Sequence, residues 1–233
     1  MCVVGWRLYG MLGGMGRFID LSHDVVGGMV TYPGLPAPQI TTHISRVESG
    51  ERLGSGASFH IGRIDMVANT GTYLDSPWHF HEEGVDLAGL KLERLADLPL
   101  TIVRRGERDA PGIDLRSLPA GPIAGHAVLF HTGWDRHWGM ESYGTGAPFL
   151  TADLVDALVE GVVALVGIDS VNIDDVTDGS RPAHSRLLGA GIPIVEHMTN
   201  LGAVPDQGCR LYAVPPKVRG FGTFPVRAFA MCD

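Results

Sequence analysis

Apolar runs alternate with polar, turn-forming stretches along most of the chain, and this alternation predicts its main elements. The segment 151–161 places its apolar residues on one face at helical spacing, begins with a threonine that can cap a helix and ends in glycine. The continuous apolar run at 162–168 follows directly and predicts a strand that is buried on both faces. A helix followed at once by such a strand is typical of α/β proteins.

Further runs rich in β-branched and aromatic residues predict the other strands. The first of these runs is expected to lead as a strand into a polar segment at 69–81. A second helix is predicted at 182–188, after an acidic loop at 169–178. We therefore expect an α/β fold with a large mixed sheet. The additional predicted strands are 59–67, 100–104, 126–132, 192–196, 210–214 and 224–229.

The polar segment 69–81, Asn-Thr-Gly-Thr-Tyr-Leu-Asp-Ser-Pro-Trp-His-Phe-His, concentrates residues capable of chemistry around a turn. Gly71 suits a positive φ angle or a close backbone approach, although an ordinary turn glycine would give the same pattern. Residues 76–84 predict a short helix, because serine can cap it, proline suits its first position and glycine ends it. His79 would then lie in the first turn, where the positive end of the helix favours a neutral, base-competent imidazole. A surface or capping histidine is the alternative interpretation of His79.

Two further candidates lie far downstream, and both could join Asp75 in a metal site. Glu196 ends the apolar strand predicted at 192–196, where a carboxylate is costly unless it is solvated, paired or bound to a cation. His184 lies in the second predicted helix. An aspartate, a histidine and a glutamate together suit zinc, manganese or iron and leave positions open for water. A salt bridge at the sheet edge is the alternative role for Glu196.

The overall composition is that of an ordinary globular protein, and the charge distribution narrows the classes of partner. The chain has 233 residues, of which 45% are hydrophobic, and a formal net charge of −8. It has no basic block, which argues against nucleic acid and against an anionic membrane surface. No stretch approaches the ~20 apolar residues of a membrane span. We expect one domain at 18–233, preceded by a poorly ordered extension at 1–17, in which Met11 or Met15 is an alternative start.

The cysteine pattern argues against a disulfide framework, and the sequence lacks the motifs of several other functional sites. Cys2, Cys209 and Cys232 are odd in number and show no Cys-x-x-Cys spacing, so we expect no disulfide framework and a cytoplasmic location. The acidic loop at 169–178 lacks the EF-hand pattern and is expected to be solvated. No phosphate-cradling glycine motif, Gly-x-Ser-x-Gly elbow or catalytic-cysteine signature occurs in the sequence. Nucleotide binding and serine or cysteine hydrolysis therefore have no support.

Four segments, in this order, resemble the bacterial cyclase family, also called kynurenine formamidase-like or isatin hydrolase-like metal-dependent hydrolases. The resemblance implies a swivelling β/β/α-type fold with a mixed sheet and surrounding helices, and assembly into a homodimer or homotetramer. The likeness extends from about residue 18 to residue 232. The four segments are Ile-Asp-Leu-Ser-His-Asp at 19–24 with Tyr-Pro-Gly at 32–34, the polar segment at 69–80, Thr-Gly-Trp at 132–134 with Gly-Ile-Asp-Ser at 167–170 and Ile-Asp at 173–174, and 184–196, which ends in Ile-Pro-Ile-Val-Glu and runs on to Asn-Leu at 200–201.

The resemblance also implies roles for individual residues. Asp75 matches a metal-ligating aspartate of the family, and His79 matches its catalytic histidine. His184 and Glu196 match a downstream histidine ligand and a downstream glutamate ligand. The implied cofactor is a divalent metal ion, zinc or manganese.

Two positions depart from the family's pattern. Asn69 and Tyr73 stand where the family has two histidine ligands, so two nitrogen donors are replaced by an amide and a phenol. This exchange is expected to weaken metal affinity or to shift the preference toward ions that favour oxygen. Asn69 and Tyr73 thus become altered ligand positions or contacts to substrate. His81 could supply a nitrogen from another direction, although an ordinary structural role is expected for it.

The implied function is hydrolysis or cyclisation at an amide, lactone or ester-type bond of a small ring-containing substrate. His79 would act as the general acid and base. A catalytically silent small-molecule-binding or scaffold protein on the same fold is one alternative. An arylformamidase of tryptophan breakdown is another.

Overall fold

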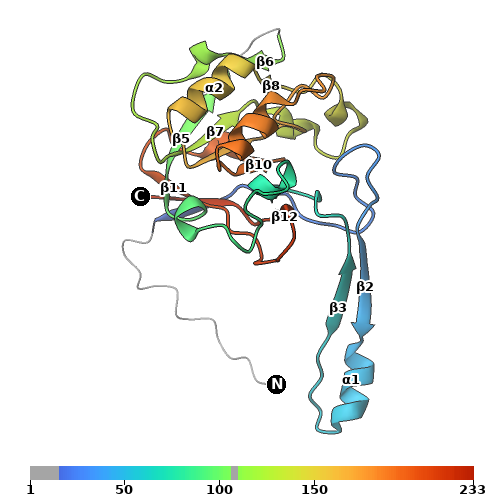
Figure 1. The fold of residues 1–233 in the computed structure, drawn as a ribbon. Helices are drawn as coiled ribbons and strands as arrows, with labels where there is room; N and C mark the ends of the chain where they lie inside the picture. Colours follow the sequence, from blue (N-terminus) through green and yellow to red (C-terminus); the bar gives the residue numbers. More distant parts are fainter. Residues whose placement is uncertain (1–15, 106–109) are drawn as a thin grey trace.

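One mixed sheet of nine strands runs through the computed structural model, which describes residues 16–105 and 110–233 (Figure 1). The strand order is β1-β13-β11-β5-β7-β9-β10-β4-β12, with β5, β7, β9 and β10 parallel and the outer strands antiparallel. The strands are β1 (Arg17–Asp20), β4 (Tyr73–Asp75), β5 (Leu98–Arg104), β7 (Ala127–His131), β9 (Leu165–Ile168), β10 (Ile194–Glu196), β11 (Cys209–Tyr212), β12 (Thr223–Pro225) and β13 (Phe229–Cys232).

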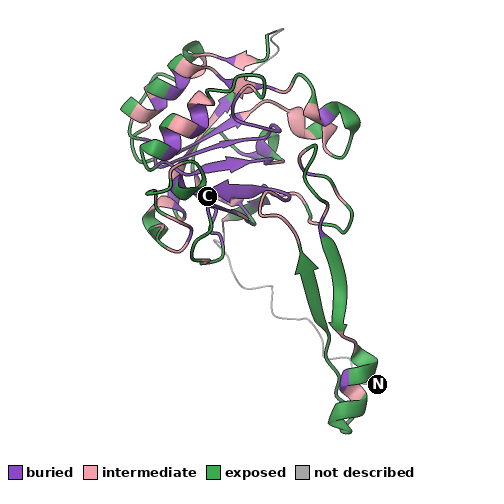
Figure 2. Cartoon of the chain, turned by 45° about the vertical axis from the view of Figure 1, so that its right-hand side comes forward, coloured by how far each residue is buried: buried purple, intermediate pink, exposed green. Residues whose placement is uncertain are grey.

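Apolar side chains cover both faces of this sheet, because successive residues of a strand point to opposite sides. Within β9, Leu165 packs into one apolar cluster, while Val166 and Ile168 pack into the other. Helix α2 (Ala152–Glu160) and the helical segment η6 (His184–Leu188) lie in the second cluster and cover that face. Figure 2 shows the central strands as the buried part of the molecule. The α/β class with a large mixed sheet is therefore confirmed.

A long hairpin projects from this body and forms a feature that the sequence analysis did not predict. We call it the arm: β2 (Gln39–Ile44), helix α1 (Arg46–Leu53) and β3 (Ile61–Asp65), with β2 and β3 paired only with each other (Figures 1 and 2). Helix α1 begins with a capping box, in which Ser45 Oγ accepts the Glu48 N–H and the Glu48 carboxylate accepts the Ser45 N–H. Every residue of β3 is exposed. The strand predicted at 59–67 is thus shorter and belongs to the arm.

Most other predicted elements are confirmed, with three corrections. Helix α2 forms where expected, but the Thr151 hydroxyl donates to the Ile113 carbonyl and does not cap the helix. The strand predicted at 224–229 is two strands, β12 and β13, separated by 226–228. The helix predicted at 76–84 is a single 3-10 turn, η1 (Pro77–His79), and Ser76 makes no side-chain cap. The remaining short elements are β6 (Gly112–Ile113), β8 (Phe149–Leu150), η2 (Leu92–Arg94), η3 (Leu115–Ser117), η4 (Trp134–His137), η5 (Glu141–Gly144) and η7 (Leu201–Ala203).

Cys209 and Cys232 form a disulfide, which corrects the expectation of no disulfide. They lie directly opposite each other on the neighbouring antiparallel strands β11 and β13, with their Cα atoms 4.1 Å apart. A separation of 23 residues in sequence gives no sign of this pairing, which the sheet register creates. Cys2 and nearly all of the extension expected at 1–17 lie outside the described residues, although Arg17 already pairs in β1. No helix in the described part of the chain has the length and hydrophobicity that a membrane crossing requires.

Candidate active site

Three adjacent strands bring the polar residues of the candidate site onto one face of the sheet. In the register of β4 with β10, Tyr73 lies opposite Glu196, and in that of β4 with β12, Asp75 lies opposite Thr223. Tyr73 and Asp75 share a face because they are two residues apart, while the intervening Leu74 points into the apolar cluster on the other side. This face is the one that η6 covers, so η6 brings His184 to the same place.

Asp75 is completely buried, and only one of its carboxylate oxygens has a hydrogen-bond partner among the described residues. Oδ1 accepts the hydroxyl hydrogen of Thr223, whereas Oδ2 has no partner and lies 3.8 Å from His184 Nε2. Burial raises the pKa of Asp75 to about 6, although His184 and the Thr223 hydrogen bond act in the opposite direction. Asp75 therefore carries its negative charge at neutral pH and has a free oxygen directed at the imidazole.

Hydrogen bonding fixes the tautomer of His79. Its Nδ1 lies 3.0 Å from Thr223 Oγ1. Because the Thr223 hydroxyl gives its only hydrogen to Asp75, His79 Nδ1 must be the donor in this contact. His79 Nε2 is then left with a lone pair, 3.8 Å from Asp75 Oδ1. Burial, and after it the nearby His184, lowers the pKa of His79, so the imidazole is neutral at pH 7.

His184 is held by Asp174, a residue to which the sequence analysis gave no individual role. The Asp174 carboxylate accepts hydrogen bonds from the Ala183 N–H at 2.7 Å, the His184 N–H at 3.0 Å and His184 Nδ1 at 2.7 Å. This contact leaves His184 Nε2 facing Asp75 and Glu196, at 3.8 Å from each carboxylate. Burial lowers the pKa of His184, but the three carboxylates outweigh it and raise the pKa to about 9. The surroundings of Nε2 thus favour a positive charge.

The acidic loop that contains Asp174 is not the solvated loop that the sequence analysis expected. Asp169 and Asp174 are both buried, with relative exposures of 0% and 2%. Asp169 accepts hydrogen bonds from the backbone N–H groups of Thr132 and Gly133, so it ties the end of β7 to the end of β9. Only the far end of the loop, including Asp178, faces solvent. Two of its carboxylates are therefore buried and hydrogen-bonded within the protein.

Glu196 is also completely buried, and both of its oxygens accept hydrogen bonds. Oε1 accepts the Ile173 N–H at 2.6 Å, and Oε2 accepts the Tyr73 hydroxyl at 2.8 Å. Burial and the neighbouring carboxylates raise the pKa of Tyr73 well above its ordinary value, so the phenol stays protonated. The Asn69 side chain acts in the opposite direction on the pKa of Tyr73. Tyr73 is thus a hydrogen-bond donor to Glu196. The ion pair of Glu196 lies in the interior and not at an exposed sheet edge, with His184 Nε2 3.8 Å from Oε1.

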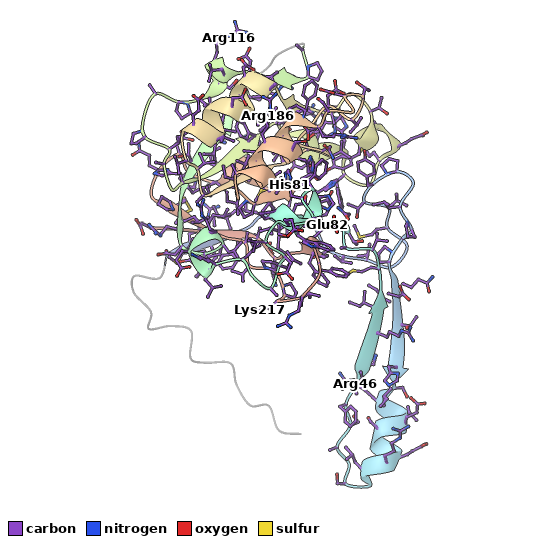
Figure 3. The ribbon with its side chains drawn as sticks, in the orientation of Figure 1. Arg46, His81, Glu82, Arg116, Arg186 and Lys217 are labelled. Atoms are coloured by element: carbon purple, nitrogen blue, oxygen red, sulfur yellow. A yellow bond between two sulfur atoms is a disulfide. The ribbon has the colours of Figure 1, made fainter. Side chains whose placement is uncertain are left out.

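Residues around the helical turn support the two histidines. His81 Nε2 donates to the carbonyl oxygen of Ser185 at 2.9 Å and so links the turn to η6, the segment with Arg186 in Figure 3. This is the structural role expected for His81. The Phe80 ring stacks on His184, with the ring centroids 4.9 Å apart. Gly222 packs against the His79 backbone, where an added Cβ would lie 2.7 Å from the His79 Cα.

A pocket of about 310 Å³ opens above this group of residues. One ligand atom each from Asp75, His79 and His184 lies within 4.8 Å of the others, which is close enough to surround one cation. Glu196 is not in that triad, although it lies beside His184. The exposed fraction of the His79 side chain is 30%, compared with 0% for Asp75. The pocket is lined by Tyr32, Leu35, Asn69, Tyr73, His79, Phe80, Asn172, Arg181, His184 and Glu196.

The structure therefore brings together all six residues that the sequence singled out, from segments more than 100 positions apart. Sequence reasoning missed Thr223 and Asp174. Thr223 carried no signal, because it is a lone threonine at the start of a short strand. Asp174 did carry a weak signal, since it lies in a segment of resemblance and ten residues before His184.

The comparisons with known proteins identify the family. The model of the Cyclase family, described as "Putative cyclase", matches residues 19–175. A kynurenine formamidase of Geobacillus thermodenitrificans (strain NG80-2) is 30% identical over 217 residues, covering 92% of this chain and 97% of the relative. A kynurenine formamidase of Bacillus cereus (strain ATCC 14579) is 28% identical over 213 residues, covering 91% and 96%.

Solved structures show the same fold. Isatin hydrolase A from Labrenzia aggregata superposes with a TM-score of 0.80 at 21% identity, covering 93% of both chains. A protein described as a potential metal-dependent hydrolase with cyclase activity gives a TM-score of 0.76 at 24% identity, covering 93% of this chain and 98% of the other. The matched family model spans more than half of the sequence. This chain therefore belongs to the cyclase family.

Proposed function

We propose that this chain is a metal-dependent hydrolase that opens an amide or lactone bond of a small, ring-containing substrate. The observation that carries the proposal is the unprotonated His79 Nε2, which lies on the pocket wall beside a buried Asp75–His184 pair. A neutral imidazole at a pocket, with its tautomer set by a fixed partner, is suited to general base catalysis near neutral pH. The names of the relatives, kynurenine formamidase and isatin hydrolase, support a carbonyl–nitrogen bond as the target.

The residues of the site fit a divalent cation. Asp75 Oδ2 is buried without a partner, and His184 Nε2 faces two carboxylates while its Nδ1 is held by Asp174. An imidazole oriented by a carboxylate in this way is the usual support of a metal-ligating histidine. We assign Asp75, His184 and Glu196 as the ligands. The chemistry that such an ion supplies is polarisation of a carbonyl and a lowered pKa of water.

Two carboxylates and one imidazole form a ligand set with more hard oxygen donors and fewer nitrogen donors than the histidine-rich pattern of the family. Because Tyr73 donates a hydrogen bond to Glu196, it orients a ligand and does not replace the missing nitrogen donor. Asn69 lines the pocket beside Tyr73. We therefore propose that manganese is preferred over zinc relative to family members that have both histidines.

His79 carries the proton in this proposal. Its Nε2 takes a proton from the water that attacks the substrate carbonyl, while its Nδ1–H keeps the hydrogen bond to Thr223 Oγ1. The imidazolium is stabilised by Asp75, 3.8 Å away, and then gives the proton to the leaving nitrogen or oxygen as the carbon–heteroatom bond breaks. The products are a carboxylic acid and an amine or alcohol, which are joined in one molecule when the substrate is cyclic.

Metal content and turnover together test the proposal. Purified protein should bind about one equivalent of manganese or zinc, and His184→Ala should lose it. With metal present, we expect hydrolysis of isatin or of the formamide of kynurenine, and His79→Ala should lower kcat by roughly 10²–10⁴-fold. Hydrolysis of the formamide alone would identify an arylformamidase. No metal and no turnover of amides or lactones would leave the silent binding or scaffold protein as the better interpretation.

We also propose that the arm packs against a second copy of the chain in a homodimer or homotetramer. A lone two-stranded hairpin is marginally stable in water, and this one exposes Val47 by 71% and Ile64 by 56%. Arg46, at the start of α1, lies far from the body in Figure 3. Light scattering should give at least twice the monomer mass, and Ile64→Asp should reduce it. A monomeric wild-type protein at micromolar concentration would contradict this proposal.

A further inference from the structure

One permanently charged cation lines the pocket that contains His79. Among the described lining residues, Arg181 is the only arginine or lysine, and Glu196 is the only carboxylate. The rest of the wall is largely aromatic or amide in character, with Tyr32 and Phe80 among its members. The pocket therefore combines an apolar wall, a negative end near His184 and one fixed positive charge.

The guanidinium of Arg181 is held in place by two uncharged acceptors, and Asp178 is a more distant negative charge. Its Nη1 donates to Asn172 Oδ1 at 3.2 Å and its Nη2 donates to the Val176 carbonyl oxygen at 3.3 Å. Both acceptors are uncharged, and no carboxylate of the described residues lies within 4.0 Å of it. A guanidinium carries five N–H donors, so donors remain for a further partner.

The backbone at Arg181 is strained, which a purely solvated arginine would not require. Its φ angle is +44°, in the left-handed region, and the next residue is Pro182. A side chain with a Cβ is disfavoured there, and a following proline restricts the residue before it as well. Such strain persists where the surrounding structure imposes it, and it is concentrated at functional sites.

The loop that holds Arg181 is the loop that holds His184. Asn172 Oδ1 accepts both Arg181 Nη1 and the Asp174 N–H, the latter at 2.9 Å. Asp174 in turn binds His184 Nδ1 at 2.7 Å. The guanidinium and the imidazole are therefore fixed relative to each other by two buried side chains. This arrangement suits a ligand that must present two different groups at a set spacing.

We propose that Arg181 binds a carboxylate of the substrate and thereby selects anionic amides or lactones over neutral ones. The inference rests on the proposed function, because it concerns the substrate of the same pocket. Among the described lining residues, only Arg181 offers a permanently charged cation, so the substrate's carboxylate lies at Arg181 and its scissile carbonyl faces His79. The apolar part of the substrate packs on Tyr32 and Phe80. Arginine suits this role because its planar fork binds a carboxylate through two parallel hydrogen bonds.

Binding of benzoate and of its neutral counterpart benzamide tests the inference without turnover. Calorimetry on the wild-type protein should show that benzoate binds more tightly than benzamide. Arg181→Gln should lower the affinity for benzoate by roughly tenfold or more and leave the affinity for benzamide unchanged. Arg181→Lys should restore part of the difference. Arg186→Gln is the matched control, because Arg186 pairs with Asp156 and does not line the pocket. Wild-type protein that fails to bind benzoate, or an Arg181→Gln variant that binds it as well, would overturn the inference.

Turnover separates this inference from the proposed function. The substrates are N-formylanthranilate and its methyl ester, which lacks the negative charge and carries one additional methyl group. The wild-type protein should favour the acid, and Arg181→Gln should raise KM for the acid alone. Equal hydrolysis of both, unaffected by Arg181→Gln, would overturn the inference and leave the hydrolase intact. No hydrolysis of either, with benzoate binding that depends on Arg181, would overturn the hydrolase and retain the anion site.

Discussion

Replacement of Asp174 by asparagine tests whether the site depends on the orientation and protonation of His184. Asp174 Oδ1 accepts the Ala183 N–H, and Oδ2 accepts the His184 N–H and His184 Nδ1. Asparagine has nearly the same shape but replaces one of these oxygens by an NH₂ group. If the NH₂ group faces His184, the tautomer reverses and the proton moves to Nε2. If it faces Ala183, a buried N–H loses its acceptor.

Both arrangements have a cost that follows from the structure. A buried donor without a partner costs about 1–3 kcal/mol, and for a chain of this size ~2 kcal/mol lowers Tm by roughly 4–8 °C. A proton on Nε2 removes the lone pair that faces Asp75 and Glu196, and loss of such a supporting carboxylate typically weakens metal binding by roughly 10–100-fold. We expect Asp174→Asn to lower both Tm and metal affinity.

Thermal unfolding of metal-free protein and calorimetric titration with manganese measure the two effects separately. Asp175→Asn is the matched control, because Asp175 lies next in the chain but accepts only the exposed N–H and hydroxyl of Thr177. It should change Tm by no more than about 2 °C, in keeping with a surface substitution. An Asp174→Asn protein with the Tm and metal affinity of the wild type would refute the role assigned to Asp174.

Three further predictions concern other parts of the molecule. Tyr73→Phe removes the donor to Glu196 Oε2 and should weaken metal binding measurably, whereas Tyr73→His should raise the affinity for zinc relative to manganese in parallel titrations. In metal-free protein, the pKa of His184 is raised from 6.5 to about 9, so its contribution to stability is fully present below pH 6.5 and is lost as the pH rises through 9. Chemical denaturation should therefore give a lower free energy of unfolding at pH 9.5 than at pH 6.5, and equal values would contradict this prediction. Cys209→Ser opens a disulfide between positions 23 residues apart, which should cost about 3 kcal/mol of unfolding free energy under oxidising conditions and nothing in the presence of a reductant.

Sequence could predict those site residues that lie close together in one segment, or that stand where their residue type is unusual. Asp75 and His79 stand four positions apart on a turn whose composition suits chemistry. Glu196 is conspicuous because a carboxylate ends an apolar strand. Asp174 and Thr223, which set the protonation of the two histidines, act only through contacts between distant strands and loops.

The arm and the disulfide show the same limit in the fold. Periodicity identified most strands of the central sheet, although not β1 and β4, because burial on one or both faces imposes a pattern on each strand by itself. Periodicity did not predict that the strand ending at Asp65 projects from the body, because an exposed hairpin is held by strand pairing and not by burial. The Cys209–Cys232 bond depends on the register of two strands that are not consecutive in the chain.

The sequence by itself determined the α/β class, most of the strands and the helix at 152–160, because these follow from local patterning. It also singled out the six residues around the pocket, because they lie in motifs that resemble those of the cyclase family. The tertiary structure decided what those residues do to one another. Strand order placed Tyr73 against Glu196 and Thr223 against Asp75, and the loop to η6 brought Asp174 to His184. Charge, tautomer and hydrogen-bond partner depend on neighbours within about 4 Å, and those neighbours come from segments that only folding brings together.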